Sequence, residues 1–107
     1  MLYKFRSKAA GDVIMMGPAG DDILRIIGKA PGAKGIIEVA DMPAAIAALE
    51  QAVVADDAAR EQAEKEAQAE GKKLPPREGV SLRQRAWPMV EMMKRSVTEK
   101  ADVVWGV

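Results

Sequence analysis

The sequence predicts a single two-layer α+β domain, in which three helices pack on one face of a small mixed sheet of four strands. Segments with strand character and segments with helical periodicity follow one another in the order β-β-α-β-α-α-β. The chain of 107 residues is 49% hydrophobic, which suffices for one core and is too short for two ordinary domains. We therefore expect residues 1–107 to fold as one unit.

The first two strands are predicted as a hairpin. In residues 1–6, Tyr3 and Phe5 fall on one face with Met1, while Leu2, Lys4 and Arg6 fall on the other. This period of two is typical of a strand with one buried face. Residues 13–16 are four consecutive apolar side chains, which indicates a central strand that is covered on both faces.

A tight turn, a short helix and a third strand are expected next. Residues 17–20, Gly-Pro-Ala-Gly, predict the turn, because proline and glycine favour sharp chain reversal. Asp21 is placed to accept from the first backbone N–H groups of a helix of about two turns. Gly28 is suited to a left-handed residue at its end. Residues 35–39 then predict the third strand.

The second helix is predicted to be long and rich in alanine. Asp41 is a candidate N-cap and Pro43 suits the first turn. Large apolar residues recur at helical spacing only in its first part, at Met42, Ile46, Leu49 and Val53. Residues 55–70 continue with strong helix formers up to Gly71, which gives a helix of roughly 40 Å. Residues 55–79 therefore comprise a helical arm followed by a linker that contains Pro75 and Pro76.

A third helix and a last strand complete the predicted fold. Ser81 and Gln84 match a capping box at the start of the helix. Its apolar stripe consists of Leu82, Ala86, Val90, Met93 and Val97. Pro88 interrupts the second turn, where we expect a kink or a restart. Residues 103–107 predict the final strand, which includes Trp105.

The composition excludes several classes of function. The chain has no cysteine and no histidine, so thiol chemistry, disulfides and imidazole-based proton transfer are absent. Sixteen basic residues balance sixteen acidic ones, which argues against nucleic-acid binding by a global positive field. No apolar run is long enough to span a membrane, and the opening residues do not form a signal peptide. We therefore expect a cytoplasmic protein with no cofactor and no assigned catalytic residue.

Two acidic or glycine-rich features are candidate ligand sites. The segment 17–20 lies between a strand and a helix, as phosphate-binding turns do, but Asp21 and Asp22 would repel a phosphate there. If the second and third strands were parallel neighbours, these two residues could join Glu38 and Asp41 in a site for Mg²⁺ or Ca²⁺. Helix capping is the alternative role for Asp21 and Asp41, and no ligand spacing requires a metal.

A basic and aromatic group near the third helix is the other candidate site. It comprises Lys72, Lys73, Arg77, Arg83, Arg85 and Trp87. Arginine beside tryptophan can bind a phosphorylated or carboxylated ligand. The alternative is structural, because residues 56–70 hold six acids against two bases and could neutralise these cations within the chain.

Small side chains form a row along the long helix. The row consists of Ala48, Ala52, Ala55, Ala59, Ala63 and Ala67, which recur every three or four positions. Such a row allows another helix to approach closely. The third helix, a second copy of the chain, or solvent alone could face it, and we expect the third helix.

Four segments resemble a family of small, mostly proteobacterial proteins catalogued as a domain of unknown function, number 1840. They are residues 7–17, residues 35–38 with 41–46, residues 81–88 (Ser-Leu-Arg-Gln-Arg-Ala-Trp-Pro) and residues 104–107 (Val-Trp-Gly-Val). The resemblance implies a cytoplasmic bacterial protein of this length. It implies no activity and no functional residue.

The sequence favours a non-enzymatic binding or protein-interaction module, a monomer or weak dimer, with no membrane or nucleic-acid partner. Histidine and cysteine, the usual acid–base and thiol groups, are missing while an unusually long alanine-rich helix is present. The alternative is a protein that binds a small ligand or a divalent metal, and that could be an enzyme. It would use the strand-end carboxylates, Asp21 and Asp41 among them, or Arg83 and Arg85 with Trp87.

Overall fold

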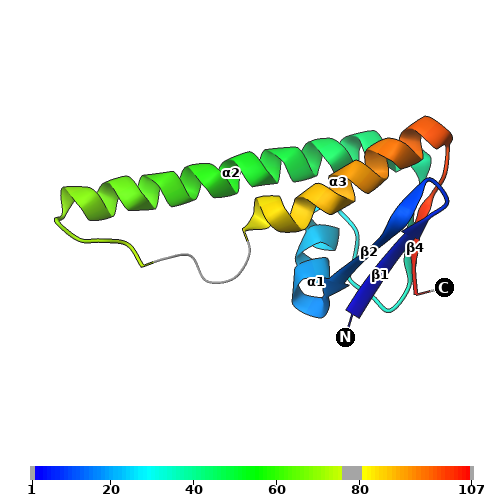
Figure 1. Ribbon diagram of the computed structural model, residues 1–107, viewed down its shortest axis with the longest axis horizontal. Coiled ribbons are helices and arrows are strands. Elements are labelled where there is room, and N and C mark those ends of the chain that lie inside the picture. The colour runs from blue at the N-terminus through cyan, green and yellow to red at the C-terminus, as the bar shows by residue number, and fades with distance from the viewer. Residues whose placement is uncertain (1, 76–80, 107) are drawn as a thin grey trace.

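A computed structural model describes residues 2–75 and 81–106. Met1, Val107 and the part of the predicted linker that includes Arg77 lie outside these residues. The elements follow in the order β1 (Leu2–Ser7), β2 (Ala10–Met16), α1 (Gly17–Ile26), β3 (Gly35–Ile37), a short 3-10 helix η1 (Val39–Asp41), α2 (Met42–Ala69), α3 (Leu82–Glu99) and β4 (Val103–Trp105). Four strands and three helices, one of them long, confirm the predicted α+β class (Figure 1).

The four strands form one sheet in the order β2-β1-β4-β3. All three pairings are antiparallel, so the sheet is not the mixed one that the sequence suggested. The last strand lies in the middle, where Trp105 stands opposite Phe5 of β1 on one side and Gly35 of β3 on the other. The strands β2 and β3, expected as possible parallel neighbours, are therefore at opposite edges.

The core lies between this sheet and the helices. Tyr3 and Phe5 are buried and their neighbours Leu2, Lys4 and Arg6 are exposed, which confirms the period of two in β1. The Phe5 ring stacks on Tyr3 and meets Trp105 edge-on, with centroids 5.6 Å apart in both pairs. The rest of the buried core comes from both layers and consists mainly of Met15, Ile23, Leu24, Ile37, Met42, Leu49, Val53, Met89, Met92, Met93 and Val103.

The strand β2 is an edge strand, which corrects the expectation that residues 13–16 are covered on both faces. Met15 points into the core, whereas Ile14 and Met16 are 62% and 66% exposed on the outer face. Leu2, opposite Met16 in the pairing, is exposed beside them. A short apolar run does not distinguish a doubly covered strand from an edge strand whose outer residues happen to be apolar.

The glycine-rich segment is the first turn of α1 rather than a turn before it. Pro18 lies in the first helical turn, where its missing N–H costs nothing, and the N-cap residue Met16 makes no side-chain cap bond. Asp21 is therefore inside the helix and is not its cap. Gly20 lies under the ring of Tyr3, where a Cβ would come within 2.1 Å of the ring carbon Cδ2. Close packing against Tyr3, not chain reversal, requires this glycine.

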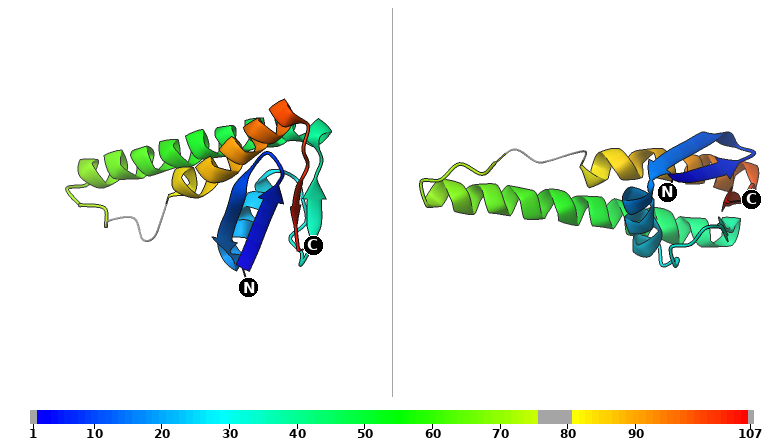
Figure 2. Two further views of the ribbon diagram at one scale, coloured as in Figure 1. Left: turned by 45° about the vertical axis from the view of Figure 1, so that its right-hand side comes forward. Right: turned by 90° about the horizontal axis from the view of Figure 1, so that it is seen from below.

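The helices α2 and α3 pack side by side and run in opposite directions (Figures 1 and 2). The capping box is confirmed: the Ser81 hydroxyl accepts from Gln84 N, and the Gln84 side chain accepts from Ser81 N. Pro88 lies inside a continuous helix, so there is no restart. Asp41 occupies the N-cap position of α2 without making a side-chain cap bond, so the predicted capping role is wrong.

The long helix continues past the start of α3 (Figure 1). Ala48 and Ala52 are half-buried, but Ala55 and Ala59 are exposed, so α3 does not cover the whole alanine row as expected. The loop after α2 returns along the arm instead, and Arg60 Nη2 donates to the Pro75 carbonyl at 2.8 Å.

Hydroxyl groups join the β1–β2 hairpin to α3. Ser96, which is fully buried, donates to the Met92 carbonyl at 2.7 Å. Because its proton is used there, Ser96 Oγ accepts from Ser7 Oγ at 2.8 Å. Ser7 Oγ in turn accepts from Ala9 N at 3.2 Å, so the hydroxyl groups of Ser7 and Ser96 both have hydrogen-bond partners.

Candidate functional site

The residues singled out in the sequence are distributed over three separate places. Asp21 and Arg85 each form contacts close to α1, and Asp41 is exposed at the start of α2. Arg83 and Trp87 lie together along a groove between α2 and α3. The predicted basic and aromatic group is therefore divided, although its three helical members are within five positions of one another.

Asp21 has a structural partner. Its carboxylate Oδ1 accepts a hydrogen bond from the hydroxyl of Tyr3, whose ring belongs to the core. This hydrogen bond, together with burial and the nearby negative charge, raises the pKa of Tyr3 above its ordinary value. The pair anchors α1 to β1, which gives Asp21 a structural role.

Arg85 is directed toward α1. Its Nη1 lies 3.3 Å from Asp22 Oδ2, and Asp22 also pairs with Arg25 at 3.6 Å. The Nε of Arg85 is buried and has no hydrogen-bond partner in the described part of the chain. The Arg85 side chain thus crosses from α3 to α1 and does not share a pocket with Trp87.

The structure does not assemble the proposed carboxylate site. Placing β2 and β3 at opposite edges removes the parallel pair on which that site depended. Among residues 2–75 and 81–106, no three acidic, histidine or cysteine side chains are grouped as metal ligands. Within the same residues, no helix has the length and apolarity that crossing a membrane requires.

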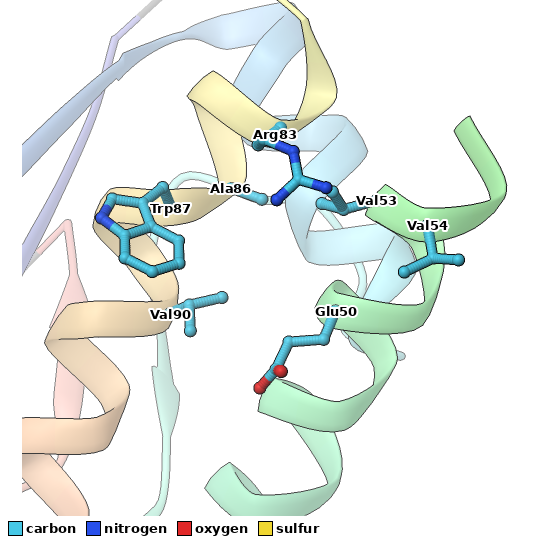
Figure 3. Close-up of a pocket in the computed structure, with 7 residues that line it drawn as sticks. All are labelled: Glu50, Val53, Val54, Arg83, Ala86, Trp87 and Val90. Carbon is cyan, nitrogen blue, oxygen red and sulfur yellow. The ribbon is translucent and has the colours of Figure 1, made fainter. Parts of the chain in front are cut away.

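The groove between α2 and α3 brings Arg83 and Trp87 next to residues of α2. It is a shallow hollow of about 140 Å³ on the outer side of the helix pair (Figure 3). Its floor is made by Val53, Ala86 and Val90, which are buried. Trp87 on α3 and Val54 on α2 form its walls and are 56% and 64% exposed. The groove therefore has an apolar floor, and its rim carries the exposed apolar side chains of Trp87 and Val54 beside the charged Glu50 and Arg83.

Two ion pairs connect the helices beside this groove. Arg83 Nη2 lies 2.7 Å from Asp57 Oδ2, and Lys94 Nζ lies 4.0 Å from Glu50 Oε1. In both pairs the acid is on α2 and the base is on α3. All four side chains are substantially exposed, so each pair adds little to stability. They do give the two walls opposite charge.

Sequence reasoning found one wall of the groove and missed the other. Glu50, Val54 and Asp57 share one face of α2, because they are four and then three positions apart. This face is adjacent to the buried stripe of Leu49 and Val53. Val54 lies outside the core stripe and between Glu50 and Asp57, and this position in the sequence indicates an exposed apolar residue on the α2 wall.

The comparisons with known proteins identify a family. The family model described as Domain of unknown function (DUF1840) matches residues 1–105, and the chain belongs to this family. No curated protein and no solved structure was found to match the chain. The family assignment covers both walls of the groove and carries no activity with it.

Proposed function

We propose that this member of the domain-of-unknown-function family is a non-enzymatic protein-interaction module of the cytoplasm, and that the α2–α3 groove is its contact surface. The observation that carries the proposal is the pair Trp87 and Val54, which face each other over an apolar floor while more than half exposed. Tryptophan is enriched among the residues that dominate binding energy in protein interfaces. Contiguous exposed apolar patches typically mark such surfaces, and Leu2, Ile14 and Met16 on the outer face of the sheet form a second patch, which the control position below tests as the rival surface.

The shape of the groove fits a helical partner better than a small ligand. A hollow of about 140 Å³ is smaller than the pockets of roughly 300 Å³ or more that enclose small molecules. Two parallel walls of helical side chains instead accept a third helix, which places apolar residues between them. The mixed-charge rim adds acids and bases that can pair with such a helix.

A photoreactive phenylalanine analogue at position 87, incorporated in the source cells, tests the proposal. We expect it to cross-link to a polypeptide, because Trp87 lies in the contact surface. The matched control carries the same analogue at position 14, since Ile14 is also an exposed apolar residue, at 62%. Cross-linking of equal yield from both positions, or none from position 87, would refute the groove as the contact surface.

A further inference from the structure

We propose that the polypeptide bound in the α2–α3 groove is a second copy of this chain, placed face to face so that α2 of each copy lies on α3 of the other. This inference rests on the proposed function and specifies its partner. It follows from the charges of the two walls, the apolar residues between them and the area available.

The walls of the groove are charged in a way that selects one arrangement of two copies. Glu50 and Asp57 make the α2 side acidic, and Arg83 and Lys94 make the α3 side basic. A second copy can be related by a two-fold axis that runs across the groove or along it. The axis across the groove places α2 on α2 and α3 on α3, so that like charges face each other and repel.

The axis along the groove reverses this pattern. It places the acidic α2 side of each copy on the basic α3 side of the other. Asp57 then faces the partner's Arg83, and Glu50 faces the partner's Lys94, because each pair already lies at the same level along the groove. An isologous contact of this kind forms every favourable pair twice.

The same axis also places the exposed apolar residues in contact. Val54 and Trp87 stand on opposite walls, so each Trp87 lies on the partner's Val54 (Figure 3). Removing both side chains from water contributes twice per dimer, and tryptophan contributes the larger share. The result is a four-helix arrangement in which neighbouring helices are antiparallel.

The area of this face indicates a weak dimer. The 18 residues of α3 span about 27 Å, and two adjacent helices are about 20 Å wide, so the footprint is roughly 500 Å² per copy. Stable interfaces bury about 800 Å² per partner. Weak specific interfaces begin at about 500 Å² per partner. We therefore expect association at micromolar or higher concentration, which added salt weakens.

Cysteine cross-linking distinguishes the two arrangements, because the chain has no native cysteine. Purified Val54→Cys protein and Trp87→Cys protein are oxidised separately and as a mixture, with one of them carrying a mass tag. We expect the mixed disulfide dimer in the mixture and little dimer in either separate sample. A dimer formed by Val54→Cys alone would overturn the proposed arrangement, and so would the absence of any disulfide dimer.

Sedimentation equilibrium of unmodified variants provides the second measurement. Val54→Asp should raise the dissociation constant at least tenfold, and Ile14→Asp, the control of nearly equal exposure, should change it less than twofold. The reverse result would place the dimer contact on the sheet and overturn the inference. If the wild-type chain stays monomeric while position 87 cross-links to a different protein in cells, the inference that the partner is a second copy is wrong. The proposed function would then stand.

Discussion

Replacing Trp105 by alanine is expected to remove a large part of the stability of the fold. Trp105 is 3% exposed in the central strand, contacts Phe5 edge-on, and donates from Nε1 to the Gly32 carbonyl at 3.0 Å. Truncating a buried tryptophan costs about 3–5 kcal/mol, and leaving that carbonyl unpaired adds about 1 kcal/mol. Domains of this kind are stable by about 5–15 kcal/mol, so the loss is between about a third of the total and all of it.

Urea unfolding followed by far-ultraviolet circular dichroism measures this loss without depending on tryptophan emission. For an m value of about 2 kcal/mol per molar, a loss of 4 kcal/mol lowers the midpoint by roughly 2 M. Trp87→Ala is the matched control, because it removes the same side chain from a position that is 56% exposed. At dilute concentration the control should change the free energy of unfolding by less than about 0.5 kcal/mol. Equal losses for the two variants would refute the central placement of β4.

Three further changes test the packing. Gly20→Ala should cost about 1–3 kcal/mol and lower the Tm, because its Cβ would lie 2.1 Å from the Tyr3 ring. The control Gly11→Ala should leave the Tm unchanged, because the added Cβ has open space. Equal Tm values for the two variants would contradict this packing. Ser96→Val should cost about 1–3 kcal/mol in urea unfolding, because it breaks the hydrogen bonds from Ser7 to Ser96 and from Ser96 to Met92. A loss no larger than that of the exposed control Thr98→Val would show that these hydrogen bonds do not stabilise the fold. Since the pKa of Tyr3 is raised in the folded protein, the unfolded chain releases this proton first, so stability is lost as pH rises above about 10. Tyr3→Phe should lack this part of the alkaline loss of stability. Parallel stability–pH profiles for the wild type and Tyr3→Phe would refute the contribution of Tyr3.

Local periodicity was sufficient to predict most elements of the fold. The alternation in β1, the capping box at Ser81 and the stripe of Met42, Leu49 and Val53 each reflect a requirement within a few consecutive turns or residues. Such patterns specify which face of an element is buried. They do not specify which other element buries it.

Apart from the local capping roles assigned to Asp21 and Asp41, the errors in the prediction concern relations between distant segments. The run at residues 13–16 was apolar enough for a central strand, and only the position of β4 beside β1 makes β2 an edge. Gly20 has the character of a turn residue, but it is small because the Tyr3 ring lies on it. Arg83 and Trp87 were predicted as site residues from the sequence, but they line a groove only because α2 packs beside them and contributes Val54 and Glu50.

The central position of β4 has a consequence for the order in which the protein matures. During synthesis the β1–β2 hairpin emerges first, and β3 follows with no strand of its own sheet to pair with, because both β1 and β3 pair with β4. The pairing of Phe5 with Trp105 joins segments that lie far apart in the sequence. Long-range pairings of this kind are slow and leave strand edges open in the meantime. The nascent chain therefore carries the β1–β2 hairpin and β3 as separate parts of the sheet until residue 105 has left the ribosome.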